Sequence, residues 1–113
     1  MNAEDLNNKG ALMLYDSTKV LLGSILRSLQ NRDTIRWDDQ IELGGECLYE
    51  IHQMARPQYK GYRTDGAHKS PALIPVHERA NRAIPHLKLM VRAIRRKDQA
   101  TAIESGNAAL AEM

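Results

Sequence analysis

Residues 70–97 read SPALIPVHERANRAIPHLKLMVRAIRRK, and this stretch decides the fold. Apolar side chains recur in it at alternating steps of four and three residues, which places six of them on one stripe of a helix: Val76, Ala80, Ala83, Leu87, Met90 and Ile94. Ile84 and Val91 widen the stripe. Charged residues, most of them basic, fall on the other faces, so the stretch predicts a helix with an apolar face and a basic outer face: Glu78, Arg79, Arg82, Lys88, Arg92 and Arg95.

Two prolines affect this helix differently. Pro75 suits the first turn, where the missing N–H has no partner within the helix. Pro85 lies in the middle, where it removes a donor and crowds the carbonyl group of Asn81. We therefore expect the helix to be kinked at Pro85, or split into 75–84 and 85–97.

Two earlier segments show the same helical period. Residues 9–29 place six side chains on one stripe, with leucines beside it: Ala11, Tyr15, Thr18, Leu22, Ile25 and Leu29. Residues 34–55 do the same, with Cys47 and Met54 beside the stripe: Trp37, Ile41, Gly44, Leu48, Ile51 and Ala55. Thr34 or Asp33 is a suitable N-cap for the second segment. Pro57 ends it.

The glycine pair Gly44-Gly45 lies in the middle of the second stripe and lowers helix propensity. Either a neighbouring helix approaches closely there, or the helix is kinked or broken. The sequence leaves both alternatives open.

A short last helix follows Asp98, which can serve as its N-cap. It covers residues 99–113, with Ala100, Ile103 and Leu110 expected to point inward.

The composition favours helices throughout. The chain of 113 residues has no Phe and one Trp, so its core must consist mainly of Leu, Ile, Met, Ala and Val. No stretch alternates apolar and polar residues as a half-buried strand does. We expect one all-α domain over 1–113, a small antiparallel bundle of about four helices, with residues 1–8 frayed.

The single cysteine, Cys47, excludes an intramolecular disulfide and a multi-cysteine metal cluster. No apolar run is long enough to span a membrane, and the polar N-terminus is unlike a secretory signal. We expect a cytoplasmic protein that does not bind a membrane and needs neither metal nor cofactor.

Charge is distributed unevenly along the chain. Residues 34–55 carry five acids and one base, whereas residues 56–97 carry eleven bases and two acids. This asymmetry indicates either neutralisation between neighbouring helices or a basic face that binds an anionic partner.

Residues 56–69, RPQYKGYRTDGAHK, have no apolar period and predict one long basic loop. Aromatic and basic side chains alternate in it, as in segments that stack on bases or grip phosphates. Together with the outer face of the third helix, it supplies the candidate partner-binding residues: Tyr59, Lys60, Tyr62, Arg63, Lys69, Arg79, Arg82, Arg92, Arg95 and Arg96.

The acidic residues of the second helix recur every four positions: Asp38, Glu42, Glu46 and Glu50. All-α nucleotide pyrophosphohydrolases use such a ridge for divalent metals but add a second acidic motif, and the third helix offers only Glu78. A solvated or salt-bridged face is therefore the favoured interpretation.

Six residues separate Arg79 from His86, a spacing similar to the loose Arg…His pattern of HEPN-type ribonucleases. In such an enzyme the arginine stabilises the phosphorane and the histidine moves the proton. Pro85 and Ala80 depart from what this pattern usually contains. An RNA-cleaving enzyme with these two residues is thus an alternative to the main hypothesis, as is a simple nucleic-acid-binding module.

The sequence favours a small interaction protein without catalytic activity, comparable to phage or mobile-element inhibitors and adaptors. Its partner would be an acidic protein surface or nucleic acid. Seams with a coiled-coil-like step also predict a homo-oligomer.

Overall fold

The computed structural model describes residues 3–55 and 73–113, and in this part of the chain every regular element is helical. Four α-helices are present: α1 (Ala3–Leu29), α2 (Trp37–Ala55), α3 (Ile74–Arg95) and α4 (Gln99–Glu112). A short 3-10 turn, η1 (Arg32–Thr34), lies between α1 and α2. The all-α prediction is thereby confirmed for the described residues. The predicted loop 56–69 lies outside them.

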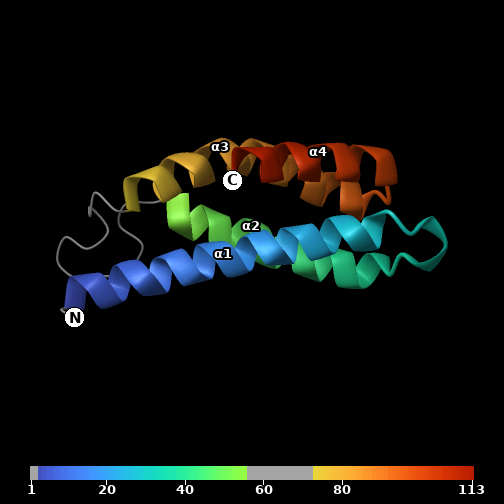
Figure 1. Cartoon of the computed structure of the whole chain (residues 1–113). Coiled ribbons are helices and arrows are strands. Elements are labelled where there is room, and N and C mark those ends of the chain that lie inside the picture. Colours follow the sequence, from blue (N-terminus) through green and yellow to red (C-terminus); the bar gives the residue numbers. More distant parts are fainter. Residues whose placement is uncertain (1–2, 56–72) are drawn as a thin grey trace.

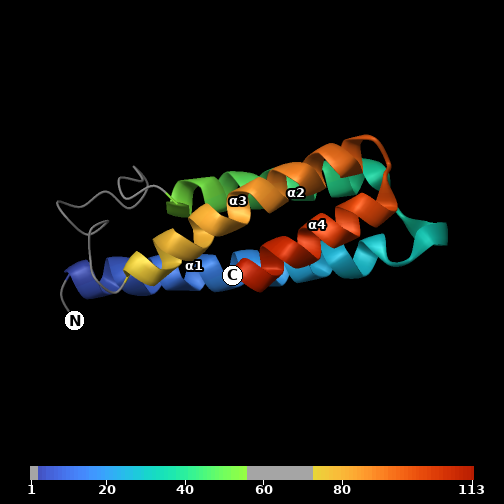
Figure 2. The same cartoon turned by 90° about the horizontal axis from the view of Figure 1, so that it is seen from above.

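Each helix packs mainly against two others, so that α1 contacts α2, α2 contacts α3, α3 contacts α4, and α4 contacts α1. The α1–α2 and α3–α4 connections lie at the same end of the molecule (Figures 1 and 2). The shorter helix α4 ends beside the middle of α1 (Figure 2). There the Tyr15 hydroxyl donates a buried hydrogen bond of 2.9 Å to the Met113 carbonyl oxygen.

The predicted core stripes of α1 and α3 are confirmed. Every residue named for the α1 stripe is buried, and so are the six apolar residues of the α3 stripe. The largest fully buried side chains include Leu22 and Ile25 of α1 and Leu87, Met90 and Ile94 of α3. These two helices therefore supply most of the large apolar groups of the core.

Helix α3 is one uninterrupted helix from Ile74 to Arg95, with Pro75 in its first turn and Pro85 inside it. The alternative of a helix split at Pro85 is wrong. Pro85 is exposed, and so is Asn81, the residue whose carbonyl group the proline ring leaves without a donor.

The C-terminus of α3 also differs from the prediction, because the helix stops before Lys97. The Asp98 N–H donates to the Ala93 carbonyl at 2.8 Å, and the Lys97 N–H donates to Ile94 at 3.0 Å. This pair of bonds is a Schellman motif, which needs a left-handed residue at its turn. Lys97 takes that place with φ of 58°.

The N-termini of two helices differ from the prediction as well. Helix α1 begins at Ala3 rather than Lys9. Helix α2 begins at Trp37, and its first backbone bond runs from Gln40 N–H to the Arg36 carbonyl group. The predicted cap by Thr34 or Asp33 is therefore wrong, because both residues belong to η1. Asp98 does cap α4, since its carboxylate accepts from the Thr101 N–H at 3.2 Å.

The surroundings of Gly44 show how the glycine pair affects α2. Helix α2 continues through it, and a Cβ at Gly44 would lie 3.4 Å from Ile94, 3.6 Å from Val91 and 3.9 Å from Met90. Helix α2 is thus not broken at Gly44, and α3 lies beside it at ordinary van der Waals contact, where a Cβ would still fit. Gly45 points elsewhere and has no such neighbours.

The inward face of α4 was predicted in part. Ala100 is exposed, whereas Ile103 and Leu110 are half-buried and pack against the core. The buried residues are the small ones, Ala102, Ser105, Gly106 and Ala109. Helix α4 lies so close to its neighbours that a Cβ at Gly106 would come within 2.5 Å of the Leu26 Cδ2 atom.

Cys47 is fully buried, and this burial, with a smaller contribution from Glu46, raises the pKa of its thiol to about 12. A thiol that stays protonated and inaccessible is unreactive. We expect Cys47 to resist a thiol reagent at pH 8 in the folded protein and to react rapidly in denaturant. Reaction at the same rate in both conditions would contradict its placement in the core.

The raised pKa also predicts a pH dependence. The folded-state pKa exceeds the ordinary value of 9.0, so the protonated thiol contributes its full stability below about pH 9 and loses it as pH rises towards 12. The free energy of unfolding should therefore fall less steeply above pH 9 in Cys47→Ala than in the wild type. Part of the fall should remain in the variant, because burial also raises the pKa of Tyr15.

Candidate functional site

The predicted partner-binding residues fall into two sets. Five of them lie outside the described residues: Tyr59, Lys60, Tyr62, Arg63 and Lys69. The other five are exposed, four on α3 and one directly after it: Arg79, Arg82, Arg92, Arg95 and Arg96.

The exposed bases of α3 form two groups rather than one continuous face. Residues three or four positions apart are neighbours on a helix, and residues six apart are not. Arg79 and Arg82 therefore lie together, and Lys88, Arg92 and Arg95 form a second group nearer the C-terminus of the helix. We call this second group the α3 basic group.

Arg79 and Arg82 lie on the side of α3 that faces α4. Arg82 Nε donates to Glu112 Oε2 at 3.0 Å. Arg79 approaches Tyr15, where its positive charge and hydrogen bond lower a tyrosine pKa that burial raises. Both arginines thus have local partners. An exposed ion pair such as Arg82–Glu112 contributes only about 0–1 kcal/mol, so it does not keep Arg82 from another anion.

The α3 basic group has no acidic partner within the described residues. The ion pairs that the structure shows there join Arg82 to Glu112 and Arg96 to Asp98, the second at 3.7 Å. Arg92 and Arg95 lie in the last turn of α3, where positive charge also favours the helix dipole. Their guanidinium groups can form paired hydrogen bonds with a carboxylate or a phosphate.

The acidic ridge of α2 does not neutralise these bases. Glu46 and Glu50 line a shallow groove with Leu14 and Leu21 of α1, so the ridge borders α1. The surface of α2 that meets α3 is instead the one that carries Gly44. Neutralisation between α2 and α3 is consequently not found among the described residues.

Arg79 and His86 lie two turns apart on one side of α3, and His86 is half-buried. The ribonuclease hypothesis requires a second copy of the chain, and it stays a prediction.

Within residues 3–55 and 73–113, no group of three or more His, Cys, Asp or Glu side chains could hold a metal ion. No helix in the same ranges is long and apolar enough to cross a membrane.

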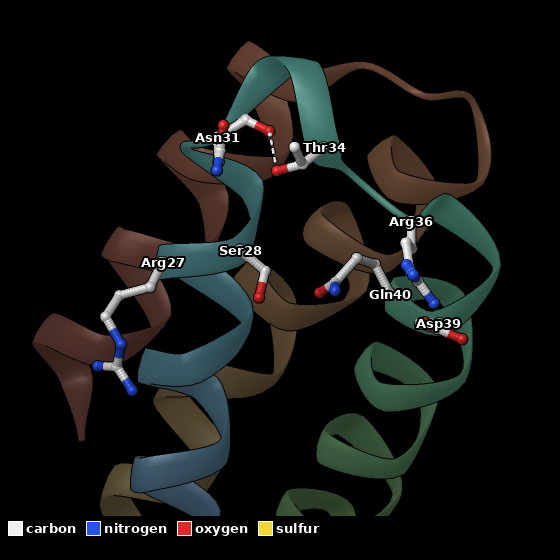
Figure 3. A pocket seen from close by; sticks show the side chains of 7 residues that line it. All are labelled: Arg27, Ser28, Asn31, Thr34, Arg36, Asp39 and Gln40. Atoms are coloured by element: carbon white, nitrogen blue, oxygen red, sulfur yellow. Dashed lines mark hydrogen bonds between the residues drawn. The ribbon is translucent and has the colours of Figure 1, made fainter.

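Sequence reasoning missed Gln40. This residue is buried at the start of α2, beside a pocket between α1 and α2 (Figure 3). The helical period could have identified it, because the buried positions of α2 recur at steps of three or four residues, apart from the last: Gln40, Gly44, Cys47, Ile51, Met54 and Ala55. The predicted stripe was placed around Trp37, Ile41 and Leu48, which are half-buried.

No known protein family, curated protein or solved structure matches this chain. Its function is therefore argued from the residues described above.

Proposed function

We propose that this is a small cytoplasmic interaction protein without catalytic activity, of the inhibitor or adaptor kind that phages and mobile elements encode. Its partner is an acidic protein surface or nucleic acid. The observation that carries the proposal is the α3 basic group, Lys88, Arg92 and Arg95, which is exposed and has no acidic partner among the described residues.

The charge distribution supports an anionic partner rather than a purely structural role. Three cations on adjacent turns of one helix repel one another, and an anion placed over them removes this repulsion. Arg96 and Lys97 continue the positive charge past the end of α3, and both are exposed. The other predicted partner-binding residues belong to loop 56–69, which lies outside the described residues.

We propose further that the helices form an antiparallel bundle in which Pro85 kinks α3, and that the protein self-associates. Self-association is supported by two apolar side chains on one side of α1, two turns apart. Met13 is 61% exposed and Val20 is 69% exposed. Burying side chains of this size under a second copy of the chain stabilises the dimer.

Size-exclusion chromatography with light scattering tests both proposals at once. The purified protein is run alone, with a single-stranded oligonucleotide and with a poly-glutamate peptide, at low and at high salt. We expect a mass that is a multiple of the monomer, and co-elution with at least one polyanion that is lost at high salt.

The pattern of co-elution identifies the partner class. Co-elution with the oligonucleotide alone assigns nucleic acid, and co-elution with the peptide alone assigns an acidic protein surface. A monomeric mass contradicts the self-association, and failure to bind either polyanion at low salt contradicts the proposed function.

A further inference from the structure

A polar pocket of about 400 Å³ lies where the end of α1 meets the start of α2 (Figure 3). Its volume falls in the range of small-molecule sites. All of its lining residues are polar or charged: Arg27, Ser28, Asn31, Thr34, Arg36, Asp39 and Gln40. A gap left by imperfect packing of apolar helices would not be lined in this way.

Gln40 is the unusual member of this set. Its side chain extends from α2 towards Ser28 of α1, on the pocket side of the helix (Figure 3). The residue is only 5% exposed, and its Oε1 atom is buried without a hydrogen-bond partner among the described residues. Buried acceptors are nearly always satisfied, because leaving one unpaired destabilises the fold. An acceptor of this kind, next to a polar pocket, can accept a hydrogen bond from a bound molecule.

The charges around the pocket indicate what else that molecule carries. Arg36 directly precedes α2 and points towards Asp39 in the first turn of that helix, and Arg27 comes from α1 (Figure 3). Arg27 lies back along its own helix, with Nη1 3.5 Å from where a Gly23 Cβ would be. It is exposed, so it can turn towards the pocket by a change of rotamer. The site offers two cations for one anion and two acceptors, Gln40 Oε1 and the Asp39 carboxylate, for donors.

We propose that this pocket binds a small molecule that combines a phosphate or carboxylate group with hydroxyl or amino donors. The anionic group pairs with Arg36 and Arg27. A donor of the same molecule satisfies Gln40 Oε1. The site is separate from the α3 basic group, and the proposal does not depend on the function proposed for that group.

Titration of the full chain followed by the backbone amide resonances tests the site. The probes are ribose 5-phosphate, L-glutamate and inorganic phosphate, each added up to about 10 mM. We expect one organic probe to shift resonances within residues 27–40, with inorganic phosphate at least about tenfold weaker, because it cannot bridge to Gln40 as well. A response to ribose 5-phosphate assigns the phosphate class, and a response to L-glutamate assigns the carboxylate class.

Two results would overturn the proposal. One is the absence of any shift in residues 27–40 with all three probes. The other is equal affinity for inorganic phosphate and the better organic probe, because Gln40 would then take no part.

A substitution at Gln40 separates a ligand-binding role from a structural one. Gln40→Met keeps the length of the side chain and removes the unpaired acceptor, so we expect it to raise the denaturation midpoint of the free protein. We also expect about a tenfold loss of affinity for the organic probe. Gln53→Met, on the same helix and outside the pocket, is the matched control and should change neither quantity. Wild-type affinity in Gln40→Met would refute the site.

Discussion

Gly106→Ala is expected to lower the free energy of unfolding by about 1–3 kcal/mol, the usual cost of overpacking a core. A Cβ at this position would lie 2.5 Å from Leu26 Cδ2 and 3.0 Å from Met90 Sδ. Leu26 and Met90 are themselves buried, so a shift of either side chain away from the added methyl group must displace the core around it. Alanine favours a helix over glycine by about 1 kcal/mol, but this gain is smaller than the expected steric cost.

Gly45→Ala is the matched control and should have the opposite sign. A Cβ there has no neighbour within 4 Å, so only the helix propensity changes. We expect stabilisation of up to about 1 kcal/mol, measured by urea denaturation beside Gly106→Ala. If Gly106→Ala were as stable as Gly45→Ala, the close packing of α4 against α1 and α3 would be wrong.

Ile94→Ala is expected to lower the free energy of unfolding by about 2–5 kcal/mol, because it removes three buried carbon atoms and leaves a cavity. Ile94 is fully buried, and its Cδ1 atom lies 3.4 Å from where a Gly44 Cβ would be. The substitution therefore opens space at the contact between α2 and α3. A total stability of about 5–15 kcal/mol is typical for a domain, so this loss is a large part of it.

Ile74→Ala is the control, because it makes the same isoleucine-to-alanine substitution on the same helix. Ile74 is 46% exposed at the start of α3, so we expect a loss below about 1 kcal/mol. Urea midpoints of the two variants should differ clearly. Similar midpoints would mean that the inward stripe of α3 has been assigned to the wrong side.

The sequence predicted the helices with large apolar residues well. Leu22 and Ile25 of α1 and Leu87 and Ile94 of α3 repeat at helical spacing, and burial of such side chains dominates the free energy of packing. Local period and tertiary packing therefore favour the same face. The sequence left open whether Pro85 kinks α3 or splits it, because the effect of an internal proline depends on the packing around it.

Hydrophobicity identified only part of the inward face of α4 and missed its small buried residues. Close approach of α4 to α1 and α3 excludes large side chains, so Gly106 and Ala109 are buried while Ile103 and Leu110 lie partly outside. Such a choice depends on the distance between helices, which only the assembled structure fixes.

The capping of the C-terminus of α2 also could not be predicted from the sequence. His77 Nδ1 donates to the Met54 carbonyl group at 2.6 Å, and Asn81 Nδ2 donates to the Ala55 carbonyl group at 3.2 Å. Two α3 side chains thus satisfy carbonyl groups that the end of α2 leaves open. The sequence around the end of α2 contains no motif that predicts this cap, because the capping side chains lie more than twenty residues further along the chain. The unpaired Gln40 is hidden for the same reason, since its environment is made by α1.

The central claim is that the α3 basic group, rather than overall net charge, binds an anionic partner. The most direct test compares two double variants of equal charge by fluorescence anisotropy with a labelled oligonucleotide and a labelled poly-glutamate peptide. One reverses two members of the α3 basic group (Arg92→Glu, Arg95→Glu), and the other reverses two bases of α1 that lie outside the pocket (Lys9→Glu, Lys19→Glu). We predict that the first loses at least about tenfold in affinity for the bound probe, while the second stays within about threefold of the wild type. Equal losses in the two variants would contradict the claim, because net charge alone would then explain binding.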